Sequence, residues 1–153
     1  MRLAVPMTTL YDEIGGAATV LALAHAWHER VLADPVVSHA FSHGFREDHT
    51  ERLAAYWAEV FGGPPAFSET MGGESQVVRI HTGNGPHEEM DRRAVDCFAA
   101  ALADAGVPPE HREALVEWFR TANEYVNHHF ASPDAVPDGL PMPVLSREAP
   151  EAG

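Results

Sequence analysis

Four long segments of the chain carry apolar residues at three- and four-residue spacing, which is the period of an amphipathic helix. No segment shows the apolar–polar alternation of a half-buried strand, and alanine is abundant. The four helices are expected over about 17–33, 47–61, 87–105 and 109–130, with shorter helical pieces over about 9–14, 36–41 and 76–81. Gly15-Gly16, Asp34-Pro35 and Gly62-Gly63-Pro64 separate them. The spacing therefore predicts an all-α domain.

The segment between Pro64 and Gly85 is predicted to be irregular and is rich in glycine, apart from one or two helical turns over 76–81. A connection of this length inside a compact domain is uncommon unless it has a function or contains an unrecognised element. Something must hold it against the helices. A bound cofactor would do so.

Length and composition limit the protein class. The chain has 153 residues, which fits one domain, and its 23 acidic residues outnumber 10 basic residues, all of them arginine. A formal charge of −13 argues against nucleic acid and against anionic membrane surfaces as partners. No apolar run approaches the roughly 20 residues of a membrane helix. The single cysteine, Cys97, excludes an intramolecular disulfide, and its predicted burial in a helix argues against a reactive thiol.

The domain organisation follows from the ends of the chain. We expect a flexible leader over 1–9, a helical domain over 10–131 and a proline-rich flexible tail over 132–153, because the tail has few large apolar groups to bury. The N-terminal residues lack the apolar core of a secretion signal. A cytoplasmic location is the simplest expectation.

Three histidines stand out by position. His28 and His49 each replace an apolar residue on the predicted inner face of a helix, and His81 ends a short helical run before a glycine-rich stretch. One such residue is usually an ordinary hydrogen-bonded core histidine. Two on different helices indicate a use, since burying an unpaired polar ring costs a few kcal/mol. A neutral imidazole suits iron, zinc or copper, but the chain lacks the motifs of a zinc site. His87 competes with His81, although its acidic neighbours are typical of a solvated turn.

Three stretches of sequence resemble a known family. They are LYDEIGGAATV at the first helix, ERLAAYWAEVFGGPPAFSE in the middle and VVRIH before the glycine-rich stretch. Over residues 10 to 130 the chain resembles the truncated haemoglobins, most closely their group II. The resemblance implies a two-over-two helical sandwich around haem b.

The resemblance also implies roles for single residues. His81 falls on the proximal iron ligand, Phe41 on an aromatic residue packed against the haem, and His49 on the distal position. Leu53 falls over the haem face and Arg52 on the residue that pairs with a propionate. The set expected to contact the cofactor is His81, Phe41, Arg52, Leu53, Tyr56, Arg79 and Ala94.

Two positions depart from the group II pattern. His28 stands where this group usually has a ligand-binding tyrosine, and Ala94, with Val95 beside it, stands where it usually has a tryptophan. The resemblance therefore implies a roomier distal pocket with two imidazoles. His49 can donate a hydrogen bond to a ligand, or its lone pair can occupy the sixth iron position.

Three functions are compatible with this pattern. The first is a haem protein that binds O2 and other diatomic ligands such as CO or NO. The second is a haem enzyme, either peroxidase-like, NO-oxidising or oxidising a small organic substrate, with His49 and His28 as acid–base groups. The third is a haem-free helical sensor or interaction domain. The haem functions imply a reductase as partner, and the chain is expected to be a monomer or a homodimer.

Overall fold

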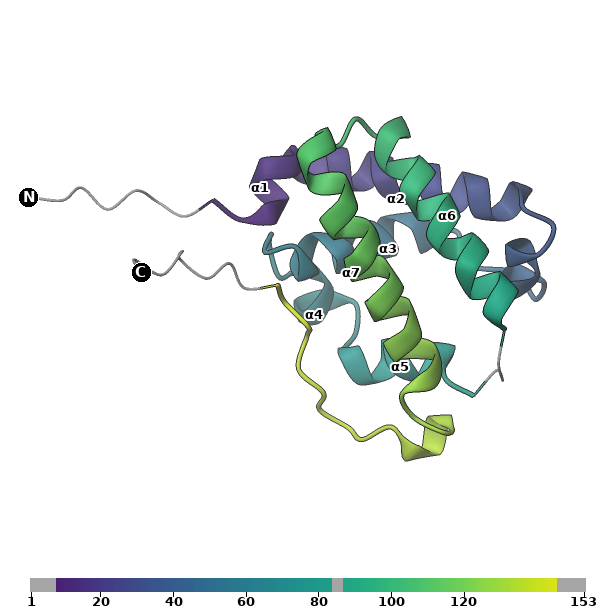
Figure 1. Cartoon of the computed structure of the whole chain (residues 1–153). Helices are drawn as coiled ribbons and strands as arrows, with labels where there is room; N and C mark the ends of the chain where they lie inside the picture. The colour runs from purple at the N-terminus through teal and green to yellow at the C-terminus, as the bar shows by residue number, and fades with distance from the viewer. Residues whose placement is uncertain (1–7, 84–86, 146–153) are drawn as a thin grey trace, which may run out of the picture.

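The computed structural model describes residues 8–83 and 87–145. Within them the chain forms seven α-helices and two short 3-10 helices, and no strand (Figure 1). The elements are α1 (Leu10–Ile14), α2 (Gly16–Ala33), η1 (Val37–Phe41), α3 (His49–Val60), α4 (Ala66–Thr70), α5 (Glu74–His81), α6 (Glu88–Asp104), α7 (Pro109–His128) and η2 (Pro133–Ala135). The prediction of an all-α fold is confirmed.

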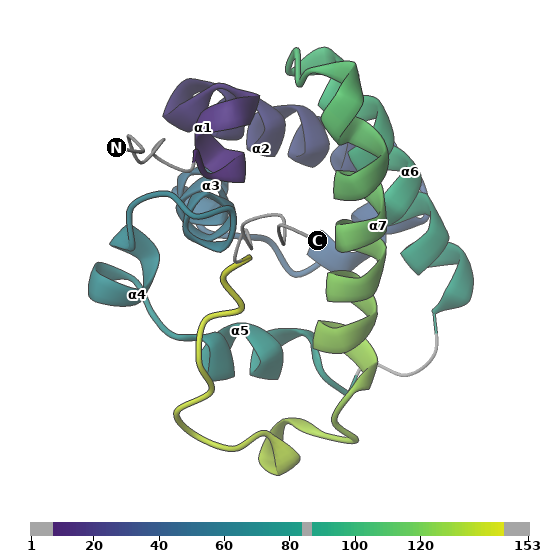
Figure 2. The same cartoon turned by 60° about the vertical axis from the view of Figure 1, so that its left-hand side comes forward.

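The long helices form two packed pairs. Helix α2 packs against α3, and α6 packs against α7, while α2 also contacts α6. In both views α6 and α7 lie side by side and cross the α2–α3 pair (Figures 1 and 2). This is the two-over-two arrangement expected from the resemblance. Among the described residues, no helix is both long and apolar enough to cross a membrane.

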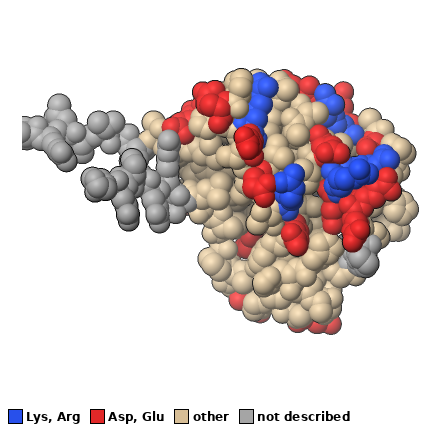
Figure 3. Space-filling view, viewed as in Figure 1, with Lys and Arg blue, Asp and Glu red and all other residues tan. Residues whose placement is uncertain are grey.

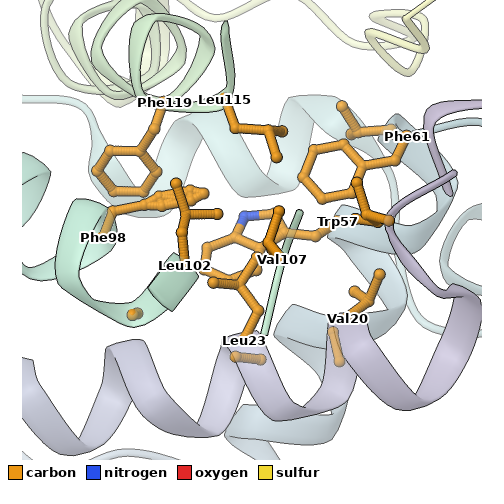
Figure 4. Packing of buried hydrophobic residues seen from close by; sticks show 14 of the residues in the cluster. Val20, Leu23, Trp57, Phe61, Phe98, Leu102, Val107, Leu115 and Phe119 are labelled. Atoms are coloured by element: carbon orange, nitrogen blue, oxygen red, sulfur yellow. The ribbon is translucent and has the colours of Figure 1, made fainter. Parts of the chain in front are cut away.

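An aromatic cluster joins the two pairs. The Trp57 ring of α3 stacks on Phe98 of α6 at 5.4 Å between centroids, and Phe98 lies 4.4 Å from Phe119 of α7 (Figure 4). From α2, Leu23 closes the cluster and is fully buried. The apolar spacing of α2 predicts an inward face through Leu21, Ala24, His28 and Val31. This was wrong for Leu21, which is 39% exposed, because the buried face passes through Val20 and Leu23 instead.

The first helix docks on the end of α3. The hydroxyl of Thr9 caps α1 by accepting from the backbone N–H of Asp12, and the backbone N–H of Tyr11 donates to the carbonyl of Phe61 at 2.9 Å. A Cβ on Gly63 would lie within 3 Å of the Tyr11 ring, so only glycine allows this approach. The start and middle motifs of the sequence therefore meet in space. Of the leader expected over 1–9, residues 1–7 lie outside the described residues.

The segment after α3 is more regular than predicted. It contains α4, which the sequence did not indicate, and α5, which begins two residues earlier than expected. The buried Glu59 carboxylate accepts from the backbone N–H of Ser68 at 2.9 Å and from its hydroxyl at 2.6 Å. This pair holds α4 against α3. Residues 84 and 85 of the predicted irregular segment lie outside the described residues.

Residues 132–145, part of the tail predicted to be flexible, lie against the helices in this structure. From η2 this segment runs past α5 to the end of α3 (Figure 2). Val136 is buried, and the backbone N–H of Leu145 donates to the carbonyl of Val60 at 2.8 Å. Hydrogen bonds to the helices hold this segment in place, and its composition gives no sign of these bonds. Residues 146–153 lie outside the described residues.

Arginines on the surface lie next to acidic side chains. On the face shown in Figure 3, the basic side chains touch Asp and Glu instead of gathering into a separate patch. Ion pairs such as Arg30–Asp104 and Arg93–Asp34 account for part of this pattern. These pairs are at least partly exposed, so each contributes little to stability.

Candidate functional site

His81 ends helix α5 with one ring nitrogen already fixed. Its Nδ1 lies 2.7 Å from the carbonyl oxygen of Val77, one turn earlier. A carbonyl only accepts, so Nδ1 carries the proton and the neutral ring has its lone pair on Nε2. Burial lowers the pKa of His81 and favours this neutral form. A neutral imidazole with this tautomer has the form that a metal-ligating histidine needs.

His28 of α2 and His49 of α3 form a close pair. Their ring centroids are 4.8 Å apart, and the His28 Nδ1 lies 3.1 Å from the hydroxyl of Thr50. The Nε2 atoms of both rings are buried and have no hydrogen-bond partner among the described residues. Leaving such atoms unpaired costs free energy, which favours a partner other than the described residues.

Two phenylalanines surround this pair. The Phe41 ring lies 5.2 Å from His28 and 5.3 Å from His49 between centroids. Phe45, in the corner between η1 and α3, lies 4.6 Å from His28 and 5.8 Å from His49, although half of its surface is exposed. Phe41 was predicted to contact the cofactor. Phe45 was missed, and its only signal was an aromatic residue in a polar corner.

The surroundings of the histidine pair favour its neutral form. Burial lowers the pKa of His28, and the neighbouring His25 lowers it further. Burial likewise lowers the pKa of His49, with additional effects of His28 and then His81. His28 and His81 therefore both disfavour the charged form of His49.

Two other predicted residues extend this region along α3. Leu53 is half-buried against the core. Arg52 donates from Nη2 to the carbonyl of Met71 at 2.9 Å and lies 6.0 Å from the Phe67 ring centroid. These bonds hold the connection between α4 and α5 near α3. The propionate role of Arg52 stays a prediction.

Tyr56 contacts an acidic residue that sequence reasoning missed. Its hydroxyl donates to Glu74 Oε1 at 2.6 Å, and Glu74 is 3% exposed at the start of α5. Burial raises the pKa of the Glu74 carboxyl, although the bond from Tyr56 opposes this, and burial also raises the pKa of Tyr56. The pair therefore links α3 to α5 by a buried hydrogen bond.

The remaining predicted residues lie on α5 and α6. Arg79 donates to the carbonyl of Val136 and pairs with Asp138, both in the C-terminal segment. The contact of Arg79 with a cofactor stays a prediction. Ala94 is buried, and its carbonyl accepts from the indole N–H of Trp27 at 3.2 Å.

His87 and Cys97, the alternative candidates for an iron ligand and a reactive thiol, are less suited to these roles. His87 precedes α6 and is exposed, which favours His81 over it. Cys97 is half-buried, and burial raises the pKa of its thiol, which disfavours the reactive thiolate. Within residues 8–83 and 87–145, no three His, Cys, Asp or Glu side chains gather as a metal site.

Comparison with known proteins identifies the family. The sequence profile of the bacterial-like globins matches residues 9–128. The chain belongs to the bacterial-like globin family. A group 1 truncated hemoglobin, GlbN of Synechocystis sp., is 30% identical over 106 residues, which cover 68% of this chain and 83% of that protein.

Solved structures of globins share the fold. The hemoglobin of Chloroflexus aurantiacus is 29% identical with a TM-score of 0.70, covering 80% of this chain and 99% of that one. The hemoglobin of Thermobifida fusca is 27% identical with a TM-score of 0.66, covering 78% and 96%. The group II truncated hemoglobin of Bacillus anthracis is 19% identical with a TM-score of 0.66, covering 82% and 94%. At that identity the last shows the fold alone.

The chain is therefore a truncated globin, and this membership implies a haem cofactor and small diatomic ligands. The assignment to group II is less firmly supported, because the curated relative above belongs to group 1. The described residues fit a haem. They provide an imidazole whose Nδ1 is fixed by Val77, an aromatic wall, and two buried imidazole nitrogens without partners.

Proposed function

We propose that this globin binds haem b through Nε2 of His81 and holds a diatomic ligand, chiefly O2, beside His28 and His49. The observation that carries the proposal is the pair of buried Nε2 atoms without partners on α2 and α3. Haem, when bound, supplies an iron that takes one histidine and leaves a position open for a small ligand.

The task of His81 is to present one lone pair in one direction. The bond from its Nδ1 to the carbonyl of Val77 fixes the ring orientation and raises the basicity of Nε2. Because the bond closes within one turn of α5, the position of the lone pair follows the position of that helix.

His28 and His49 act on the ligand side. When the hydroxyl of Thr50 donates to Nδ1 of His28, the proton of His28 lies on Nε2 and can be donated to a ligand. His49 can provide a second N–H, or it can occupy the sixth iron position itself. In either case a ligand or metal would pair with a nitrogen that is otherwise buried and unsatisfied.

A haem enzyme is the second candidate, and the contact between the two imidazoles favours it. Rings 4.8 Å apart with lowered pKa values can accept a proton from a peroxide and return it to the departing oxygen. Such an activity needs an electron donor such as a reductase, or an oxidisable small molecule.

Dissociation of O2 from the reduced protein tests the proposal. We expect His28→Leu and His49→Leu each to speed dissociation roughly tenfold, the value of one lost hydrogen bond. His39→Leu is the matched control, since His39 is exposed on η1. If both site variants release O2 and turn over peroxide at the wild-type rates, the assignment of the ligand side is wrong. Unchanged O2 release with lost peroxide turnover would favour the enzyme.

A further inference from the structure

The segment 132–145, called the strap below, lies beyond the residues that match the family profile. We propose that the strap fixes helix α5 and thereby positions His81, with Ser75 as the residue that joins strap and helix. This inference rests on the proposed function, because it takes His81 to be the haem ligand.

Ser75 is bonded to the strap on both sides of a turn. Its hydroxyl donates to the carbonyl of Pro137 at 2.7 Å and accepts from the backbone N–H of Leu140 at 3.0 Å. Between them Gly139 has a φ of +75°, which allows the strap to turn around the hydroxyl. Ser75 is buried, so losing the hydroxyl would leave two main-chain groups of the strap without these bonds.

Arg79 repeats the contact one turn later on the same face of α5. Its guanidinium donates to the carbonyl of Val136 at 2.9 Å and pairs with Asp138. The ion pair by itself is worth little because Asp138 is almost fully exposed, but Val136 is only 4% exposed. The strap therefore contacts α5 from Ser75 to Arg79, two residues before His81.

The strap also reaches the helix of the opposite histidine. Beyond Leu140, Met142 packs against the core and the N–H of Leu145 donates to the carbonyl of Val60 at the end of α3. One segment thus connects α5, which carries His81, to α3, which carries His49, and Figure 2 shows its course between them.

Helix α5 depends on such contacts because it has only eight residues. A helix this short is not stable by itself in water, so its neighbours set its position. These neighbours include α7 and the strap. On the α7 side, the hydroxyl of Thr82, at the end of α5, donates to the carbonyl of Val126 in α7 at 3.0 Å. Loosening the strap would release one side of α5, and the lone pair of His81 would move with the helix.

The full-length variants Ser75→Ala and Val136→Ala test the proposal. Arg79 is unsuitable because it is also predicted to contact the cofactor. Ser68→Ala is the matched control. Ser68 lies on α4, away from the strap, and the substitution removes the hydrogen bond from its hydroxyl to Glu59 of α3. Three properties are measured: hydrogen exchange of the α5 amides in the haem-free protein, the rate of haemin transfer to an excess of acceptor apoprotein, and the iron–histidine stretching band of the reduced protein.

We expect both strap variants to speed α5 exchange and to release haemin about tenfold faster, with a shifted iron–histidine band. Ser68→Ala should stay within about twofold of wild type in release and keep the band. Unchanged α5 exchange in both strap variants would show that the strap does not hold the helix. Faster exchange with unchanged haemin release and an unchanged band would show that the strap does not position His81. Failure of the wild type to take up haemin would instead refute the proposed function.

Discussion

Removing the hydrogen bond between Thr50 and His28 tests the proposal that His28 lies beside the bound ligand. Thr50→Val keeps the shape of the side chain and deletes the hydroxyl that lies 3.1 Å from Nδ1 of His28. Both residues are buried, at 8% and 7% exposure. Since Nε2 of His28 already has no partner among the described residues, the variant would leave both ring nitrogens unpaired.

The expected loss in the free energy of unfolding follows from the number of unpaired ring nitrogens. One buried group loses its partner, and the partner's own hydroxyl disappears with it, so the penalty is that of a single unsatisfied nitrogen, about 1–3 kcal/mol. For a domain of this size each kcal/mol lowers Tm by roughly 3 °C, so we expect a decrease of roughly 3–9 °C. The tautomer of His28 is also released, so O2 dissociation from the haem-loaded protein should change as well.

Urea unfolding of the haem-free protein measures the first effect, and stopped-flow O2 release measures the second. Thr70→Val is the control, because Thr70 is exposed and its hydroxyl donates within its own helix, to the carbonyl of Ala66. If Thr50→Val unfolds like wild type to within about 0.3 kcal/mol, His28 is satisfied in another way and the argument from unpaired nitrogens is refuted.

Three further predictions concern buried ionisable groups. Glu74→Gln keeps an acceptor for Tyr56 and removes a carboxyl whose pKa is raised by burial in the folded state. The wild type therefore loses stability as the pH rises from the ordinary carboxyl pKa toward the raised one, so the variant should be stabilised relative to wild type more at pH 8 than at pH 5; equal urea-unfolding effects at the two pH values would contradict this. His49→Leu should stabilise the haem-free protein by about 1 kcal/mol, because it removes a buried unpaired nitrogen; a loss of stability in the same assay would show that the ring is well accommodated. The lowered pKa values of His28, His49 and His81 mean that unfolding takes up protons below the ordinary value of 6.5, so stability should fall as pH drops from there toward the lowered values. Unfolding free energies that stay constant between pH 7 and 5.5, or a His28→Leu/His49→Leu double variant with the same pH slope as wild type, would argue against this assignment.

Most of the fold was predictable from helical periodicity in the sequence. The long helices were predictable because each buries one face, and the turns between them contain Gly or Pro at positions that stop a helix. The register was less certain, as Leu21 shows, since α2 is apolar on several sides and a shift of one residue looks equally good. Helix α4 and the strap depend on distant partners, Glu59 for one and Ser75 for the other, and a local pattern does not contain them.

The candidate site was predictable in part for the same reason. His28, His49 and His81 stood out because a polar ring interrupts an apolar face or follows a short helix. The contact between His28 and His49 depends on how α2 and α3 pack, and a shared site with His81 was predicted only through the family resemblance. Thr50 gave no signal, because a threonine in a helix usually bonds to its own backbone.

Haemin titration with His81 variants tests the central claim most directly. Wild type, His81→Ala and His87→Ala are titrated with haemin, and visible spectra are recorded for the ferric protein and for the dithionite-reduced protein with and without CO. We expect wild type and His87→Ala to give one sharp Soret endpoint and a CO-shifted band, and His81→Ala to lose both. A wild-type spectrum in His81→Ala, or loss of the spectrum in His87→Ala alone, would contradict the assignment of the iron ligand.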